Sequence, residues 1–246
     1  TPDFIKEFAA YLSTEAGLRN GSIWANCMWL KGVVMKAHYN GLIPRNPFIQ
    51  FHISPNVKER EYLTEDELKA VMTHEFADSK LAYIRDIFIF ASFTALSFVD
   101  IQELTNDNIV EVNGEKWILS KRHKTKVAFQ VKLLDIPLQI VERYRPMQKD
   151  NRIFPGLNYW SICKPLKRMI RECGITKSIS FHCSRHGFAT LALSKGMPIE
   201  SVSRVLGHTN IVTTQLYAKI TTQKLDNDLT MFGDKLSKTF NGITMS

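Results

Sequence analysis

Apolar residues recur at helical spacing along the first forty positions of the chain. Those of a first segment are Phe4, Phe8, Tyr11 and Leu12, and those of a second segment are Ile23, Leu30, Val33, Val34 and Ala37. Apolar positions three or four residues apart are typical of amphipathic helices, so residues 2–41 predict two of them. Prolines and charges between residues 44 and 60 favour an extended linker. We therefore expect a helical domain over residues 1–56 and a second domain over residues 57–246.

The second domain begins with a helix-start pattern. Thr64 is followed three positions later by Glu67, the spacing of a capping box, and Leu63 with Leu68 has the spacing of a hydrophobic staple. The stretch over residues 81–96 predicts a strongly apolar helix.

Residues 107–134 change to short apolar runs typical of strands. Asn113-Gly114 lies between two such runs, at residues 110–112 and 117–119, and this dipeptide favours a tight hairpin. Beyond Pro137 the pattern predicts helices that end near Gly174, over residues 184–195, and over residues 199–206 before Gly207. The expected fold class is mainly α with a small antiparallel β-sheet.

Composition narrows the class of protein. The chain has 246 residues, 44% of them apolar and 23% charged, which is ordinary for a folded protein with one large or two unequal domains. We expect no membrane partner, because no apolar run approaches the roughly 20 residues that a spanning helix needs, and no secretion signal opens the chain. Thr1 in place of methionine favours a piece of a longer protein.

Cysteine usage and charge point to a cytoplasmic protein with a polyanionic partner. Cys27, Cys163, Cys173 and Cys183 form no CxxC pair, so we expect reduced thiols and no zinc site. The net charge of +8 and the pI of about 9.3 favour a nucleic acid, since cations near phosphates release counterions.

Several residues of the second domain could act together on a phosphodiester. They are Lys124, His182, Arg185, His208 and Tyr217. Each has an ordinary structural explanation by itself: a solvated hairpin lysine, a surface pair of neighbours on one helix, a helix-end histidine and a half-buried aromatic ring. Together they supply the cationic and neutral donors that displacement at an anionic phosphate requires.

The order and spacing of these residues resemble the tyrosine recombinases, also called the phage integrase family. The His-x-x-Arg box is His182-Cys183-Ser184-Arg185, the Leu-Gly-His box is Leu206-Gly207-His208, and the nucleophile box is Thr213-Thr214-Gln215-Leu216-Tyr217. The resemblance covers essentially the whole chain, and it implies that residues 1–56 are a core-DNA-binding domain. The partner is then double-stranded DNA, with accessory DNA-bending proteins as further candidates, and no metal or cofactor is implied.

The resemblance also implies the role of each residue. Tyr217 would attack the phosphate and form a 3'-phosphotyrosine, releasing a 5'-hydroxyl. Arg185 grips two phosphate oxygens, which a guanidinium can do bidentately. His182 is the candidate base, His208 donates to the phosphate, and Lys124 protonates the leaving oxygen.

One position departs from the family pattern. The first arginine of the family lies in a Thr-Gly-Leu-Arg box, which here is Thr94-Ala95-Leu96-Ser97. Arg122 is the nearest substitute, because it lies two residues before Lys124 and residues two apart on a strand share a face. An equally weighted alternative is that Arg122 positions the DNA backbone. Serine at this position resembles integrases of Bacteroides-type conjugative or integrative elements.

The end of the chain carries a further apolar pattern, at Leu225, Leu229, Phe232, Leu236 and Phe240. Such tails in the family are often donated to a neighbouring protomer, so we expect a homo-multimer on DNA, with packing on its own domain as the alternative.

Three alternative functions remain open from the sequence. The loss of arginine at Ser97 would suit a catalytically weak or degenerate DNA-binding relative. A type IB topoisomerase uses the same chemistry but does not need to bring two DNA sites together. His182 and His186 four residues apart would suit a metal hydrolase, although Cys183 stands where the zinc-protease motif has glutamate.

Overall fold

The computed structural model describes residues 1–49, 51–54, 61–148, 150–217 and 222–239. The chain forms two compact units, Thr1–Glu59 and Arg60–Ser246. The domain boundary expected near Asn56 lies outside the described residues.

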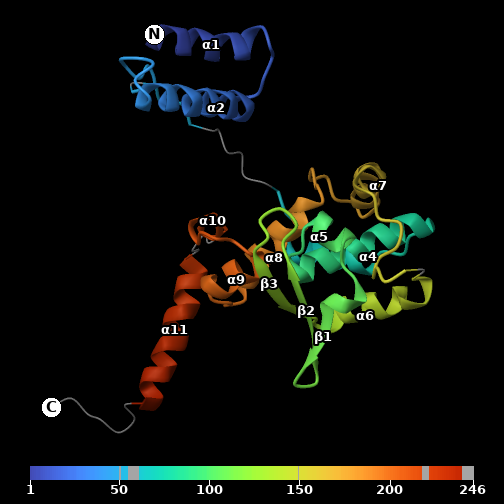
Figure 1. Ribbon diagram of the computed structural model, residues 1–246. Helices are drawn as coiled ribbons and strands as arrows, with labels where there is room; N and C mark the ends of the chain where they lie inside the picture. The colour runs from blue at the N-terminus through green and yellow to red at the C-terminus, as the bar shows by residue number, and fades with distance from the viewer. Residues whose placement is uncertain (50, 55–60, 149, 218–221, 240–246) are drawn as a thin grey trace, which may run out of the picture. The chain divides into compact units, whose positions relative to one another are not determined.

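The first unit is built on two helices that pack against each other, α1 (Pro2–Thr14) and α2 (Asn20–Tyr39) (Figure 1). The prediction of two helices is confirmed. The predicted inner face of the first is partly wrong, because Phe4 and Tyr11 are 53% and 56% exposed while Ile5 and Leu12 are buried. Ile5 and Leu12 are seven residues apart and share one face, and the two aromatic residues each precede them by about 100° of helical rotation.

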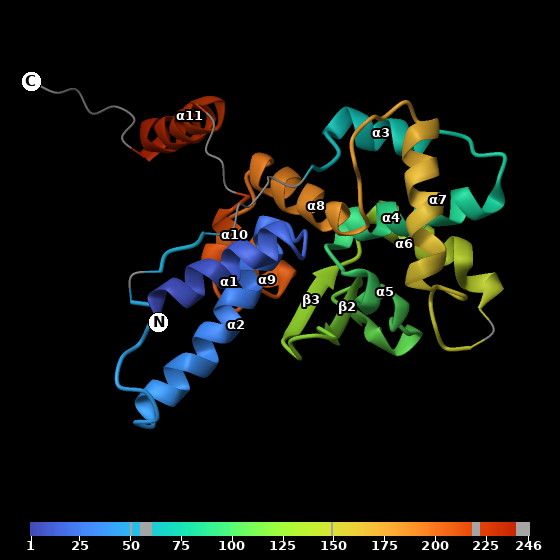
Figure 2. The same cartoon turned by 90° about the horizontal axis from the view of Figure 1, so that it is seen from above.

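The second unit is organised around the apolar helix α4 (Ser79–Thr94). Its neighbours are α3 (Glu65–Thr73), α6 (Asp135–Tyr144), α7 (Tyr159–Glu172) and α8 (His182–Ser194), which contact it from different sides (Figure 2). A helix that is covered in this way can carry apolar residues on all its sides, which explains the largely apolar stretch in the sequence.

Local sequence signals determine where α3 begins and where the short helix after α4 begins. The Glu67 carboxylate accepts from the Thr64 N–H at 2.7 Å, and the Thr64 hydroxyl accepts from the Glu67 N–H at 3.3 Å, so the predicted capping box is confirmed. Leu63 and Leu68 are both buried, as a staple requires. After α4, Ala95 has a φ of 56°, and Ser97 caps the short helix α5 (Phe98–Gln102).

A three-stranded antiparallel sheet follows, in the order β1-β2-β3. The strands are β1 (Ile109–Val112), β2 (Glu115–Lys121) and β3 (Ala128–Lys132). The φ angles of Asn113 and Gly114, 53° and 77°, are both positive, as a primed hairpin turn requires. The predicted hairpin and the predicted fold class, mainly helical with a small antiparallel sheet, are therefore confirmed.

The last part of the chain contains α9 (Ile199–Leu206), α10 (Val212–Gln215) and α11 (Thr222–Thr239). Helix α9 contacts β3, α8 and α10. Two single-turn 3-10 helices, Asn106–Asn108 and Arg145–Met147, complete the described elements. None of the helices within the described ranges is both long and apolar enough to cross a bilayer.

Helix α11 carries the apolar pattern expected at the end of the chain. Leu225, Leu229, Phe232 and Leu236 are between 39% and 59% exposed, and Phe240 lies outside the described residues.

Candidate active site

The C-terminal end of α9 is where the two candidate arginines meet. The last four carbonyls of a helix have no partner within it. Here the Ser203 and Arg204 carbonyls accept from the His208 and Gly207 N–H groups at 3.1 and 3.0 Å, in a Schellman-type turn. The next two carbonyls, of Val205 and Leu206, accept from Nη2 of Arg122 (at 2.5 Å) and Nη2 of Arg185, respectively. The helix end therefore holds both guanidinium groups.

Arg122 is fixed by three further contacts. Its Nη1 donates to Oδ2 of Asp100 at 2.7 Å, and the guanidinium carbon lies 4.0 Å from the centre of the Phe129 ring. On another side, a Cβ added to Gly207 would lie 3.0 Å from Nε and 3.1 Å from Cγ of the arginine. Burial lowers the pKa of Arg122, and the hydrogen bond and charge of Asp100 oppose that effect. A guanidinium group is cationic at neutral pH.

Asp100 joins α5 to the turn that carries Arg122. Its carboxylate accepts from the Ser97 hydroxyl at 2.7 Å and from the His123 N–H at 3.0 Å. Burial alone would raise the pKa of this carboxylate, but the hydrogen bonds from His123, Ser97 and Arg122 lower it. The serine that stands in the arginine box therefore binds the same carboxylate oxygen as Arg122.

Arg185 is held by main-chain carbonyls. Its Nη1 donates to the Ala95 carbonyl at 2.8 Å, at the end of α4. Burial, followed by the positive charge of Arg122, lowers the pKa of Arg185 to about 10, and electrostatic interactions with Tyr217 and Asp100 oppose this shift. The two arginines are thus close enough to repel each other, and an anion between them would relieve that repulsion.

His208 lies next to both arginines. Burial, followed by the charges of Arg185 and Arg122, lowers the pKa of His208 to about 4. The ring is therefore neutral at pH 7. Its Nδ1 lies 2.9 Å from Oγ1 of the fully buried Thr214, and if Nδ1 accepts that hydroxyl proton, Nε2 carries the N–H that a phosphate oxygen can accept.

Tyr217 lies one turn after Thr214 and faces α8. The Tyr217 N–H donates to the Thr214 carbonyl at 3.0 Å. The phenol ring is half-buried and contacts the ring of His186, with centroids 4.9 Å apart. His186 in turn contacts His182 at 5.0 Å. The structure therefore brings together five of the six predicted site residues, namely Arg122, His182, Arg185, His208 and Tyr217.

A match to a known family accounts for this arrangement. Residues 61–224, more than half of the chain, match the model of the phage integrase family. The chain belongs to the phage integrase family. Members of this family, the tyrosine recombinases, are DNA strand-transferring enzymes, so the family predicted from the sequence motifs is confirmed. The match also decides against the metal-hydrolase alternative.

Individual tyrosine recombinases resemble the chain over much of its length. XerA of Pyrococcus horikoshii is 32% identical over 177 residues, which are 66% of this chain and 58% of XerA. XerC of Lactobacillus leichmannii is 25% identical over 229 residues, which are 87% of this chain and 77% of XerC. The chain thus spans about three fifths to three quarters of the length of these relatives.

Solved structures of integrases share the fold. The Tn1549 transposon integrase in complex with a circular intermediate DNA has a TM-score of 0.80 and 18% identity, over 94% of this chain and 85% of that one. The XerH recombinase bound to a palindromic difH substrate has a TM-score of 0.73 and 20% identity, over 93% of this chain and 72% of that one. At sequence identities this low, the structural similarity shows that the chain shares the fold of these proteins.

The sixth predicted residue of the integrase site, Lys124, lies in the turn between β2 and β3 and is exposed. The expectation that it shares a strand face with Arg122 is wrong. Strand β2 ends at Lys121, and Arg122 begins a tight turn in which its N–H donates to the Val127 carbonyl at 2.8 Å. Side chains do not alternate in such a turn, so Arg122 is buried while Lys124 reaches solvent.

Sequence reasoning missed Asp100, Gly207 as a packing residue, and His186 as a contact of Tyr217. Two signals were available: Ser97 followed three positions later by Asp100 is a capping box, and His186 lies one helical turn after His182.

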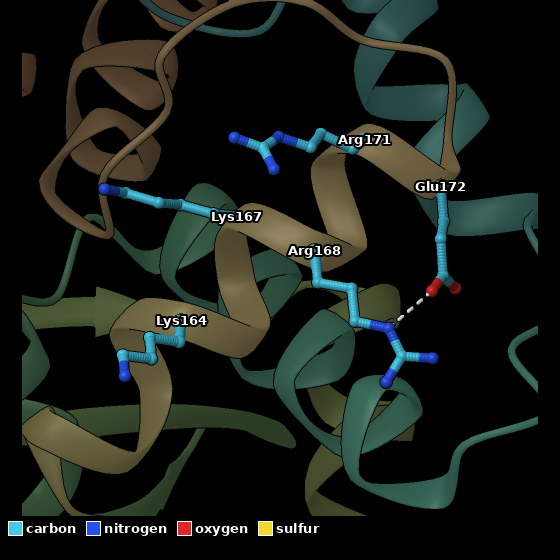
Figure 3. Close-up of a pocket in the computed structure, with 5 residues that line it drawn as sticks. All are labelled: Lys164, Lys167, Arg168, Arg171 and Glu172. Carbon is cyan, nitrogen blue, oxygen red and sulfur yellow. Dashed lines mark hydrogen bonds and ion pairs between the residues drawn. The ribbon is translucent and has the colours of Figure 1, made fainter.

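A basic face lies on α7, apart from the candidate catalytic residues. Lys164, Lys167, Arg168, Arg171 and Glu172 line an open pocket of about 440 Å³ (Figure 3). Arg168 donates to Glu172 at 2.8 Å. Among the described residues no carboxylate forms an ion pair with Lys164, Lys167 or Arg171, so this face carries uncompensated positive charge. Within the described ranges, no group of three or more His, Cys, Asp or Glu side chains is placed so that it could hold a metal ion.

Proposed function

We propose that this integrase is a site-specific DNA recombinase that cleaves and rejoins DNA strands through a 3'-phosphotyrosine intermediate. The observation that carries the proposal is the gathering of Arg122, Arg185 and His208 around the end of α9, next to Tyr217. Two buried cations and a neutral imidazole donor form a preorganised site for one phosphate group, which is the main requirement of phosphoryl transfer.

Each residue then has one role. The Tyr217 oxygen attacks phosphorus and gives its proton to His182. Arg185 and His208 stabilise the charge on the non-bridging oxygens. The bond to the 5'-oxygen breaks, and that oxygen takes a proton from Lys124. A phosphodiester is exchanged for another phosphodiester, so religation needs no ATP.

In this proposal Arg122 performs the function of the arginine that Ser97 replaces. Three features support this assignment. The side chain interacts electrostatically with Arg185 and His208, and it is bound to Asp100, which also binds Ser97. Its buried Nε has no hydrogen-bond acceptor among the described residues, and a phosphate oxygen would supply one.

The partner is double-stranded DNA. The net charge of +8 and the uncompensated cations of α7 suit a phosphate backbone. Residues 1–56 serve as the core-DNA-binding domain and residues 57–246 as the catalytic domain. The related Tn1549 integrase and XerH are themselves described bound to DNA.

Assembly on DNA uses the tail of the chain. The exposed apolar side chains of α11 fit a helix that packs on a neighbouring protomer. Serine at position 97 favours an integrase of a Bacteroides-type conjugative or integrative element, with accessory DNA-bending proteins as additional partners.

The decisive experiment traps the covalent intermediate on a DNA site that contains a nick, and detects it on a denaturing gel. Wild-type protein should form an adduct, and Tyr217→Phe should form none while still binding DNA. An absence of adduct in the wild type would favour a degenerate DNA-binding relative. Adducts without any joining of two sites would favour a topoisomerase.

A further inference from the structure

The segment that carries the nucleophile packs on α9 but leaves most of its apolar side chains exposed. Ile211, Val212 and Leu216 are 37%, 56% and 71% exposed, so the apolar residues around α10 contribute little packing. The buried residue of this segment is Thr214, which bonds to His208. The orientation of Tyr217 therefore depends strongly on what its own ring contacts.

His186 provides such a contact. It lies on α8, one turn after His182, and its ring faces that of Tyr217 with an angle of 53° between the planes. Both ring nitrogens of His186 are shielded from solvent. The residue as a whole is half-buried, and its ring offers a flat surface against which a phenol can pack.

We propose that His186 is a positioning residue for the nucleophile, an inference that rests on the proposed role of Tyr217. Packing against the imidazole restricts the two side-chain torsions of the tyrosine, and so restricts where its oxygen lies. An in-line attack needs that oxygen about 3 Å from phosphorus, and a misplacement of about 1 Å costs on the order of 100-fold in rate.

The position of His186 also links the tyrosine to its base. His182 and His186 are separated by one turn of a rigid helix, and their rings are 5.0 Å apart. The helix that carries the base thus also carries the surface on which the phenol rests. A contact with α8 therefore fixes the distance over which the tyrosine proton is transferred.

The first test compares two substitutions at position 186. His186→Ala removes the ring, and we expect covalent adduct formation at saturating protein to slow by about 10-fold to 100-fold while DNA affinity is retained. His186→Phe keeps a ring of similar extent and should recover most of that loss. His74→Ala is the matched control, because it removes a half-buried histidine ring from Phe76, 4.4 Å away, outside the site.

An unchanged rate in His186→Ala would overturn the proposal. A His186→Phe variant as slow as His186→Ala would also overturn it, because the ring nitrogens rather than the ring surface would then matter. If the wild type forms no adduct, the proposed function fails before the inference is reached.

The second test removes tyrosine from the reaction. In a Tyr217→Phe background, hydrogen peroxide can supply the attacking oxygen, while the 5'-oxygen leaves as before. If His186 acts only through Tyr217, adding His186→Ala should leave this peroxide-dependent cleavage unchanged. A loss of peroxide-dependent cleavage would show that His186 acts on the phosphate or on the adjacent ring of His182, and would overturn a positioning role through Tyr217.

Discussion

Arg122 and Arg185 bind adjacent carbonyls of the same helix end, those of Val205 and Leu206. The negative end of the α9 dipole stabilises the two cations where they would otherwise only repel each other. A site that holds two arginines so closely before DNA arrives is preorganised for a phosphate, and its reorganisation on binding is small.

The first prediction concerns the substitute arginine. Arg122→Ala should slow cleavage by about 100-fold or more, the effect of losing one preorganised donor, and should weaken DNA binding only slightly. Ser97 and Arg122 both bind Oδ2 of Asp100, so Ser97→Arg should restore part of the rate in the Arg122→Ala background. Single-turnover cleavage of a nicked site measures both effects. A fall in affinity and salt dependence without a change in rate would make Arg122 a DNA-positioning residue.

A second prediction uses two glycines with similar backbone angles. Gly207 and Gly174 have φ values of 63° and 74°, so alanine at either should cost about 1–2 kcal/mol in the free energy of unfolding. A Cβ added at Gly207 would lie 3.0 Å from Nε of Arg122. A Cβ added at Gly174 would have no neighbouring atom within 4 Å. Urea denaturation should therefore show comparable losses, while cleavage should fall by about 10-fold only in Gly207→Ala. Equal activity in the two variants would show that Arg122 accommodates the methyl group.

A third prediction follows from the neutral ring of His208. Burial and the nearby arginines lower the pKa of His208 to about 4 in the folded protein, from an ordinary value of 6.5. Between these values the unfolded chain binds a proton that the folded protein does not, so this residue makes stability fall as the pH falls from 6.5 to 4. His208→Gln should lose less stability than the wild type between pH 7 and pH 5 in urea denaturation. Parallel losses would mean that folding leaves the pKa of His208 unchanged.

Lys124 gives a fourth prediction, specific to its proposed acid role. Lys124→Ala should cleave ordinary DNA slowly, because the leaving 5'-oxygen then lacks a proton donor. A substrate with sulfur at that bridging position releases a thiolate, which needs no proton, and should restore the rate. If the sulfur substrate stays slow while binding is intact, the acid is another residue.

The fifth prediction concerns the exposed apolar side chains of α11. Deleting the chain after Thr222 should abolish recombination between two sites but preserve binding of one protomer to one half-site. Thermal stability should fall little, because these side chains are largely exposed in the single chain. Unfolding of the truncated monomer would instead show that the tail packs on its own domain.

Much of the fold could be predicted because its signals are local. The capping box at Thr64 and the Asn113-Gly114 turn each act within four residues, so the sequence alone contains their cause. The inner face of α1 was predicted less well, since a choice between adjacent apolar residues depends on what packs against the helix.

Site residues that belong to sequence motifs could be predicted, whereas residues placed by long-range packing could not. Arg122 was predicted to belong to the site, but by a strand argument that the structure contradicts. Its location depends on contacts with Asp100 and with the end of α9, which are 22 and 83 residues away in the sequence. The role of Gly207 depends on the same long-range contact, so no local pattern could indicate it.

The binding positions of the two arginines consist mainly of peptide carbonyls, which every amino-acid sequence provides. Point substitutions in α9 therefore leave these acceptors in place, provided that the helix still ends at the same residue. A guanidinium can then reach them from whichever neighbouring segment has the length to do so. The acceptors at the end of α9 therefore do not by themselves determine whether the second cation comes from the start of α5 or from the turn after β2.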